Sequence, residues 1–501
     1  MKKILLHLQK EINALSADYA DVRFVALDRV RVRAKDGALD EVKETKSTGI
    51  GFRVLKDGAF GFSATGDLSE ASLRLHLRRA LEMAKRFSVT CRAEIKLAPV
   101  KPARDRWQTP VRKDPWGMPL RQKLKPLLEA QKELKSHAWV ETANGLLDFT
   151  RKRVTFISTD GSWIEQTHYR TGGWIYGESR LGSERIRRSW PGPSGAYRAQ
   201  GYEAIEHAKF EREAVRLARE LKELSKSPEA PTGTFDLILK GSILALQIHE
   251  TFGHASEADR IYGYEDNFGG RTFLNPGLLG GFPVASKEVT IVSDAGLDLG
   301  PGAGGFAYDD EGVKAKRFEV IRKGVFWGHL TNREIALFLN QTESSASSEK
   351  ISKSSRTVLE AAASSANMVA EDWSHYPLIR MTNLSLLPGT GSLAEMIRDV
   401  KEGFILDSES SWSIDDMRLD FQIGGEAGYH IRNGKITGLV RFPFYHGNTL
   451  DFWRSCDAVA GKKEWDFWGF PDCGKGGPYQ EAFTGHGLSP ARFRNVRFGR
   501  D

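Results

Sequence analysis

Two histidines and a glutamate stand close together in the segment GSILALQIHETFGHASEA, residues 241–258. His249, Glu250 and His254 form the pattern His-Glu-x-x-x-His. Two imidazoles can hold a divalent metal ion, and a neighbouring carboxylate can take a proton from water that the metal activates. The segment therefore predicts hydrolytic chemistry at a zinc ion.

The spacing of these histidines differs from that of the usual zinc-binding helix, where imidazoles at i and i+4 lie one above the other. His249 and His254 are five residues apart, which places them about 140° apart around an ideal helix at roughly 100° per residue. Both reach one ion only if the helix is overwound, is bulged, or ends near Gly253. A π-type bulge is common at functional sites, and glycine would permit it. The alternative is two unrelated histidines at a helix end, one of them capping a carbonyl.

The elements around this segment are predicted from its flanks. The run TFDLILK (234–240) predicts a strand that leads directly into the helix with His249. Short strands are predicted after it, in KEVTIVSDAG, RFEVIRKGVFWGHL and AGYHIRNGKITGLV, the last with a hairpin turn at Asn433-Gly434. The serine-rich segment 342–365 predicts a long surface loop or a mobile flap.

The first half of the chain alternates between strand and helix patterns. Turn signals at Asp36-Gly37 and Asp57-Gly58 divide a predicted antiparallel meander over residues 19–64. A second strand group is predicted over 139–179. Its piece DGSWIEQTHYRTGGWIYGE is similar to the earlier DGALDEVKETKSTGIGF, which predicts two similar hairpins. Helices are predicted at the N-terminus, over 69–87 with Ser69 as the cap, near 118–136 and over about 202–225.

We therefore predict an α+β fold in two parts. The N-terminal α+β domain, residues 1–225, would hold an antiparallel sheet with helices. The C-terminal domain, residues 226–501, would be mostly β and would contain the metal-binding helix. The segment SKSPEAPTG (225–233) has the composition of a linker.

Composition places the chain among ordinary globular proteins, with 40% hydrophobic and 27% charged residues. No run approaches the ~18 apolar residues of a membrane span, and polar residues interrupt the N-terminal MKKILLHLQKEINALSAD, so we expect an amphipathic helix rather than a signal peptide. The net charge of +7 is spread beside acidic residues, apart from the short tail ARFRNVRFGRD. We predict a cytoplasmic protein with no membrane or nucleic-acid partner. Its three cysteines are too few for a disulfide framework.

Four motifs occur in an order that we recognise: HETFGH (249–254), YDDEG (308–312), IRMTNLSLLPG (379–389) and DCGKGG (472–477). YADVRF at 19–24 also fits. With these motifs the chain resembles the TldD/PmbA family of bacterial and archaeal peptidases, once described as modulators of DNA gyrase. The resemblance is to the TldD branch, which keeps the His-Glu-x-x-x-His set, and it covers nearly the whole chain.

The resemblance implies a zinc metallopeptidase (zinc hydrolase) that acts on small or unfolded peptides. Carried over to this sequence, it implies that His249, His254 and Cys473 hold Zn2+ and that Glu250 is the catalytic base. It also implies an oligomer, either a homodimer or a complex with a PmbA-type (TldE) subunit, that encloses the active site. The sequence PYQEAFTGHGLSP after the cysteine motif departs from the family pattern, so groups that line the substrate channel are expected to differ.

The residues themselves leave the third ligand open, because 219 positions separate His254 from Cys473. Cys456, His446 and His486 are the rivals. We expect Cys456 to be a small buried side chain and His446 to be a hydrogen-bonded residue of an aromatic strand. His486, flanked by glycines in TGHG, is a candidate for binding a substrate carboxylate or an oxyanion, and Tyr479 is a weaker one.

Further polar residues have no assigned role. Three adjacent acids, Asp309, Asp310 and Glu311, would not converge on one cation from a strand, and in a turn such acids cap backbone N–H groups. Arg380 and Asn383 are candidates for contacts with a peptide backbone, or are structural.

Two other functions stay open at this stage. One is a zinc amidohydrolase that acts on a modified amide. The other is a non-catalytic peptide-binding or regulatory subunit of a TldD/PmbA-type complex, although pure binding would not need the general base that Glu250 provides.

Overall fold

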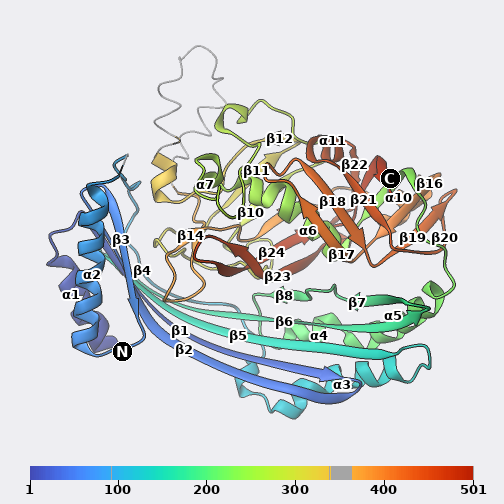
Figure 1. Ribbon diagram of the computed structural model, residues 1–501, viewed down its shortest axis with the longest axis horizontal. Coiled ribbons are helices and arrows are strands. Elements are labelled where there is room, and N and C mark those ends of the chain that lie inside the picture. Colours follow the sequence, from blue (N-terminus) through green and yellow to red (C-terminus); the bar gives the residue numbers. More distant parts are fainter. Residues whose placement is uncertain (92, 338, 340–363, 500–501) are drawn as a thin grey trace.

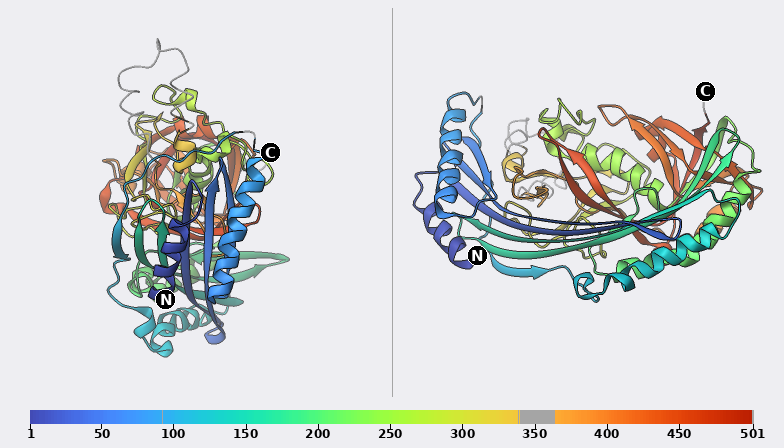
Figure 2. Two further views of the ribbon diagram at one scale, coloured as in Figure 1. Left: turned by 90° about the vertical axis from the view of Figure 1, so that its left-hand side faces the viewer. Right: turned by 60° about the horizontal axis from the view of Figure 1, so that its bottom comes forward.

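The computed structural model describes residues 1–91, 93–337, 339 and 364–499, and its architecture is α+β, as predicted. Long strands of the first half run beneath a set of shorter strands from the second half (Figure 1). Seen from another side, the long strands form a curved trough whose concave face receives the second half (Figure 2, right). The domain boundary near residue 225 stays a prediction.

The first half forms one eight-stranded sheet. Its order is β3-β2-β1-β5-β6-β4, and β7 and β8 also pair with β6. All pairs are antiparallel except β4 with β6. The strands are β1 (Tyr19–Lys35), β2 (Ala38–Lys56), β3 (Ala59–Thr65), β4 (Arg104–Gln108), β5 (Thr142–Ser158), β6 (Trp163–Leu181), β7 (Glu184–Trp190) and β8 (Ala196–Arg198).

The two predicted Asp-Gly turns connect β1 to β2 and β2 to β3. Asp36 and Asp57 both have φ of 49°, and each is followed by a glycine with positive φ. Such turns match the right-handed twist of the strands that they join. The two similar hairpins are confirmed, but the Thr-Gly pairs do not interrupt β2 or β6. A Cβ on Gly49 would lie 2.2 Å from the ring of Trp373, so glycine here lets a segment of the second half pack on the sheet.

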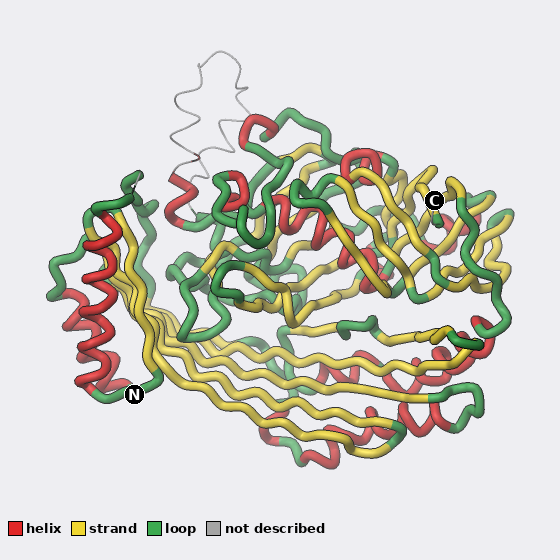
Figure 3. The backbone as a smooth tube through the Cα atoms, viewed as in Figure 1, coloured by secondary structure: helices red, strands yellow, loops and turns green. Residues whose placement is uncertain are grey.

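Helices cover the outer face of this sheet (Figure 3). The amphipathic first helix buries Leu5, Leu8 and Ile12 along one stripe. Ser69 caps the second helix by accepting the N–H of Ser72, as predicted. The helix predicted over 202–225 is divided at Lys209, whose φ is 49°. The helices are α1 (Lys2–Asn13), α2 (Glu70–Ser88), α3 (Leu120–Lys135), α4 (Glu203–Ala208) and α5 (Phe210–Leu224), with a short 3-10 turn η1 (Pro115–Gly117).

The second half is built around a nine-stranded sheet. Its order is β17-β18-β21-β25-β9-β16-β19-β20, with β22 paired to β25. The first strand after the linker, β9, lies at the centre, and its last three residues, Leu237, Ile238 and Leu239, are buried. The strands are β9 (Gly233–Leu239), β16 (Glu402–Leu406), β17 (Glu409–Ile414), β18 (Asp420–Gly425), β19 (Ala427–Arg432), β20 (Lys435–Arg441), β21 (Phe444–Asn448), β22 (Cys456–Val459) and β25 (Ala491–Phe498).

Smaller sheets complete the second half. They are the sheet β12-β11-β10-β15, the pair β13-β14 and the hairpin β23-β24. Their strands are β10 (Ile291–Asp294), β11 (Arg317–Arg322), β12 (Val325–Phe326), β13 (Met368–Val369), β14 (Leu378–Ile379), β15 (Leu384–Leu386), β23 (Asp466–Lys475) and β24 (Gln480–Leu488). The helices are α6 (Gly241–Ile248), η2 (His249–Gly253), η3 (His254–Ser256), α7 (Ala258–Ile261), η4 (Pro276–Leu278), α10 (Leu393–Arg398), α11 (Thr449–Arg454) and η5 (Lys462–Glu464).

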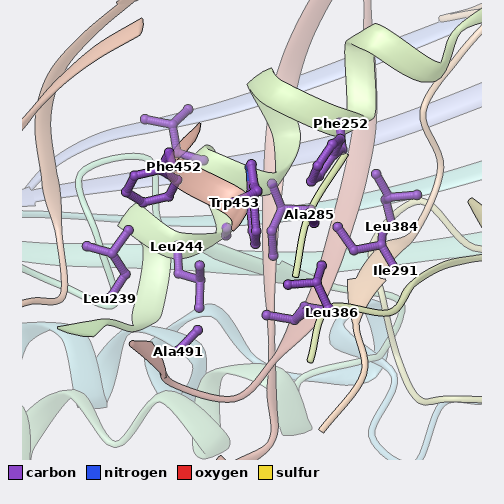
Figure 4. Packing of buried hydrophobic residues seen from close by; sticks show 14 of the residues in the cluster. Leu239, Leu244, Phe252, Ala285, Ile291, Leu384, Leu386, Phe452, Trp453 and Ala491 are labelled. Atoms are coloured by element: carbon purple, nitrogen blue, oxygen red, sulfur yellow. The ribbon is translucent and has the colours of Figure 1, made fainter. Parts of the chain in front are cut away.

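The main apolar core surrounds the helix that continues from β9. Leu244 and Phe252 of this helical segment pack among Trp453, Leu239 and Ala491 (Figure 4). The Trp453 indole N–H also donates to the Thr251 hydroxyl at 2.8 Å. Because every residue of α6 is buried, the helix is held on all sides and presents the residues at its C-terminal end in a fixed position.

Two of the three adjacent acids connect the two halves. Glu311 accepts from Arg53 of β2 at 2.9 Å, and Asp310 lies 3.3 Å from Arg23 of β1. Asp309 accepts the backbone N–H groups of Glu311 and Val313, so it caps a turn.

Of the serine-rich segment 342–365, only the last two residues belong to the described part of the chain. No helix among the described residues is both long and apolar enough to cross a membrane.

Candidate metal centre

The structure brings His249, His254 and Cys473 together. One ligand atom from each, a ring nitrogen or the sulfur, lies within 4.8 Å of the others, and all three side chains are buried. The histidines come from the end of the α6 helix and the cysteine from the hairpin β23-β24. Residues more than 200 positions apart thus form one donor set.

A π-helical turn brings the two histidines to one side of the helix, although they are five residues apart. Residues His249–Gly253 form the turn η2, and the N–H of His254 donates to the carbonyl of His249, five residues earlier. The predicted bulge is confirmed. Gly253 itself has an ordinary helical φ of −61°, but a Cβ there would lie 2.3 Å from the sulfur of Met381. The glycine therefore makes room for Met381 rather than supplying an unusual backbone angle.

A chain of hydrogen bonds fixes the ring of His249. Its Nδ1 lies 3.0 Å from Nε2 of His486, and Nδ1 of His486 lies 2.8 Å from the carbonyl of Leu384. A carbonyl can only accept, so His486 Nδ1 carries the proton and its Nε2 is an acceptor. His249 then donates from Nδ1, which leaves its Nε2 lone pair for a metal. The proposed role of His486 as an oxyanion donor does not fit this arrangement, because its ring is fully buried and both nitrogens are bonded.

Glu257 fixes the second histidine in the same way. Its carboxylate lies 3.0 Å from Nδ1 of His254, on the opposite side of the ring from Nε2, which is 3.5 Å from the sulfur of Cys473. A carboxylate behind a ligating histidine orients the ring and strengthens it as a donor. Burial lowers the pKa values of both His249 and His254, which favours the neutral, ligating imidazole.

Lys475 of the cysteine motif connects the hairpin β23-β24 to the segment that follows His254. Its fully buried ammonium lies 2.8 Å from Asp259 and 3.2 Å from Glu257. Arg260 adds a further ion pair to Glu257, at 2.9 Å. Burial alone would raise the pKa of Glu257, but Lys475, His254 and Arg260 outweigh it and hold that pKa well below its usual value. Glu257 is therefore a permanent anion behind His254.

Cys473 lies in β23 opposite Ala482 of β24, just after a bulge in the pairing. Arg380 donates to the backbone carbonyl of Cys473 and, at 3.3 Å, to that of Gln480. Burial raises the pKa of the Cys473 thiol, but its contact with His254 and the charge of Arg380 outweigh burial, so the pKa lies below its usual value. The thiolate, which is the metal-binding form, is therefore favoured.

Glu250 lies beside this set, in the first position after His249. Its Oε2 accepts from Nη1 of Arg418 at 2.8 Å, and Nη2 of Arg418 donates to the carbonyl of Gly269 at 2.8 Å. Arg418 belongs to the turn between β17 and β18 and has a φ of 63°, a backbone angle that only a well-supported turn imposes on a non-glycine residue. The structure thus fixes Glu250 through its ion pair with Arg418.

The rival residues lie outside the donor set. Cys456 is buried in β22, where its sulfur is 3.8 Å from the carbonyl of Ala458, and burial raises the pKa of its thiol. His446 belongs to β21, on the large sheet. Tyr479 is half exposed and packs edge-on against Phe268, with ring centroids 5.8 Å apart. Asn383 bonds the backbone of Asp294 and Gly304 and is structural.

Sequence reasoning assigned no role to three residues of this centre. Lys475 stood within the motif DCGKGG, and Glu257 lies three residues after His254, one helical turn away, so both had a local signal. Arg418 had none, because only the fold places its turn beside Glu250.

The donor set fits a zinc ion. Two neutral imidazoles and one thiolate are ligands that zinc prefers, and three protein ligands with a fourth position open are typical of catalytic rather than structural zinc sites. The three donors are buried, lie close to one another and have their other polar atoms satisfied by His486, Glu257 and Arg380.

Comparison with known proteins identifies the family of the chain. The model of the "PmbA/TldA metallopeptidase C-terminal domain" matches residues 232–500, and that of "PmbA/TldA metallopeptidase domain 1" matches residues 20–84. A metalloprotease of Methanothermobacter thermautotrophicus is 27% identical over 484 residues, which cover 96% of this chain and 95% of that protein. A zinc metalloprotease TldD homolog of Saccharolobus solfataricus is 25% identical over 250 residues, or 49% of this chain and 47% of that protein.

Two solved structures have the same fold. A Thermotoga maritima protein proposed as a modulator of a DNA gyrase gives a TM-score of 0.75 at 17% identity, over 99% of this chain and 100% of that one. TldE from Thermococcus kodakarensis gives a TM-score of 0.71 at 14% identity, over all of both chains. Since the C-terminal family model alone spans more than half of the sequence, the chain belongs to the PmbA/TldD family of metallopeptidases.

Proposed function

We propose that this protein is a zinc-dependent peptidase that hydrolyses small or unfolded peptides. His249, His254 and Cys473 hold the ion and Glu250 is the general base. The observation that supports this most directly is the buried cluster of two imidazoles and one thiol within 4.8 Å, beside a carboxylate. The metalloprotease names of the relatives support the reaction class.

When bound, zinc would supply a Lewis acid that polarises the scissile carbonyl and makes a water molecule acidic. The residues around it prepare this chemistry. His486 and Glu257 keep Nε2 of each ligating histidine unprotonated, while Arg380 supports the backbone of Cys473.

Glu250 moves the proton. Its Oε2 is bonded to Arg418, so Oε1 is the atom that we assign to take a proton from the attacking water. The glutamate then passes the proton to the nitrogen of the leaving amine, as a general base that becomes a general acid. The ion pair with Arg418 holds the carboxylate beside His249 until that transfer.

Metal analysis tests the centre. We expect one zinc per chain in the purified protein, and a loss of at least tenfold in zinc affinity in Cys473→Ser. Cys456→Ser is the matched control, because that thiol lies outside the cluster, and it should keep the zinc. Full zinc content in Cys473→Ser would refute the ligand assignment.

Hydrolysis assays test the reaction. Glu250→Gln should keep zinc but lose nearly all cleavage of an unfolded polypeptide. Cleavage of small amides but not of peptides would favour an amidohydrolase. A wild-type protein that binds no zinc even when zinc is added would favour a non-catalytic peptide-binding or regulatory subunit.

We also propose that the protein acts as an oligomer, either with a second copy or with a TldE-type subunit. The support is the shared fold with TldE over the whole chain. Size measurement by light scattering, with the protein alone and mixed with such a subunit, distinguishes a homodimer from a hetero-oligomer.

A further inference from the structure

A cavity of about 80 Å³ lies between the trough of the first half and the hairpin β23-β24. Strands β1, β5 and β6 form one wall, and residues 369–371 and 380–382 with the hairpin form the other. At ~10–15 Å³ of such volume per water molecule, the cavity has room for about five to eight waters, which is enough for a small organic molecule.

The register of the sheet places polar residues in one row on this wall. Thr150 of β5 pairs directly with Arg29 of β1 and with Arg170 of β6. Lys152, two residues after Thr150 on the same face of β5, adds another cation. All four line the cavity. Arg29 is paired with Asp148 at 3.0 Å, so the positive charge available to a ligand comes from the other residues.

Three cations of the cavity have no carboxylate partner among the described residues. Lys152 donates to the carbonyl of Ala370 at 2.7 Å, and Arg170 donates from Nε to that of Ala303 at 2.6 Å. Arg380, on the other wall, donates only to the carbonyls of Cys473 and Gln480. Burial lowers the pKa values of Lys152 and Arg170, and the charge of Asp310 offsets this only in part. Buried charge without an ion-pair partner is poorly compensated, so the cavity attracts an anion.

Two atoms of the lining also lack any hydrogen bond within the described structure. They are Oγ1 of Thr150 and Nε of Arg380. Thr150 is 4% exposed and Arg380 is 1% exposed. Buried polar atoms of native proteins nearly always have a partner. The hydroxyl of Thr150 and the Nε–H of Arg380 belong to residues that line one cavity, and both need an acceptor, which an oxyanion supplies.

Two acids restrict the kind of anion. Glu371 and Glu481 line the cavity, and Glu371 accepts the backbone N–H of Glu481 at 2.7 Å. Burial raises the pKa of Glu481, and the charge of Glu371 raises it further. These carboxyl groups repel a multiply charged anion but can accept a hydrogen bond from an N–H group. A molecule with one carboxylate and a neighbouring amide N–H can pair its carboxylate with the cations and donate its N–H to the acids.

We propose that this cavity binds the free carboxylate end of a short peptide. The carboxylate lies among Lys152, Arg170 and Arg380 with the hydroxyl of Thr150 as a further donor, and the last amide N–H faces the acids. Arg380 also holds the backbone of Cys473, so it connects this site to the metal centre. The site is distinct from the metal, and binding there does not require hydrolysis.

Calorimetric titration of the zinc-loaded protein with N-acetylglycine near pH 7 tests this proposal. The neutral N-acetylglycinamide is the matched ligand. We expect one saturable site for N-acetylglycine and at least tenfold weaker binding of the amide. Binding should persist after zinc is removed with a chelator, because the ligand does not coordinate the metal.

Variants locate the site. Thr150→Val keeps the side-chain shape and removes only the unpartnered hydroxyl, so the melting temperature without ligand should not fall while the affinity for N-acetylglycine drops several-fold. Lys152→Met should lower the affinity at least tenfold. Arg153→Gln is the matched control, since Arg153 is the next residue on β5, points to the opposite face and pairs with Asp28.

Several results would overturn the proposal. Affinity that is unchanged in both Thr150→Val and Lys152→Met would exclude this cavity. Loss of binding when zinc is removed would mean that the carboxylate coordinates the metal. Inorganic phosphate that binds as tightly as N-acetylglycine would indicate a general anion site instead of one for a peptide end.

Discussion

Replacing His486 with phenylalanine tests how the metal centre is organised. The ring of His486 accepts from Nδ1 of His249 at 3.0 Å and donates to the carbonyl of Leu384 at 2.8 Å. Phenylalanine keeps a planar ring in this fully buried position but removes the acceptor. The Nδ1–H group of His249 is then left without a partner, which costs about 1–3 kcal/mol. At about 1.4 kcal/mol per tenfold change, zinc affinity should fall by roughly 5- to 150-fold.

The assay is competition for zinc with a chromophoric chelator, on variants whose circular dichroism shows that they are folded. His486→Gln should lose less than His486→Phe, because the glutamine oxygen reaches about the position of Nε2 and can accept. His446→Phe, a similar change at a histidine outside the cluster, should leave the affinity unchanged. Nitrogen NMR of wild type should show His249 protonated at Nδ1.

The reasoning is refuted if folded His486→Phe binds zinc within twofold of wild type. It is also refuted if His249 carries its proton on Nε2, since that nitrogen could not then be the ligand.

Three further predictions concern stability. Lys475→Met leaves the buried anion of Glu257 without its main cation, so the free energy of unfolding in urea should fall by about 3–5 kcal/mol, and a loss below 1 kcal/mol would contradict the ion-pair assignment. Gly253→Ala places a Cβ against the sulfur of Met381; this overpacking should cost about 1–3 kcal/mol, and wild-type stability would show that the helix can move aside. Burial raises the pKa of Glu409 from 4.5 to about 7, so the folded state binds its proton more tightly and wild-type stability falls as pH rises through this range. Glutamine has no such proton to lose, so the free energy of unfolding of Glu409→Gln should rise relative to that of wild type by up to about 3 kcal/mol between pH 4.5 and 8, at 1.36 kcal/mol per pH unit. A difference between the two proteins that does not change with pH would contradict the raised pKa of Glu409.

Local patterns in the sequence determined turns, a helix cap and helices of this protein. The turns at Asp36 and Asp57, the cap at Ser69 and the amphipathic first helix depend on residues only a few positions apart, so each could be predicted from its neighbours. The five-residue spacing of His249 and His254 predicted a distorted helix for the same reason, since a helical turn must bring both rings to one side.

Only the tertiary structure decided which distant groups meet. The choice of Cys473 over Cys456 depends on the register of β23 with β24 and on the packing of that hairpin against the helix, which the spacing along the chain does not encode. Arg418 reaches Glu250 from the turn between β17 and β18, 168 positions further along the chain. The row of Arg29, Thr150 and Arg170 exists only because three strands pair in one register. Contacts between segments that are far apart depend on how sheets stack and curve, and this is set by the packing of the whole core rather than by any local run of residues.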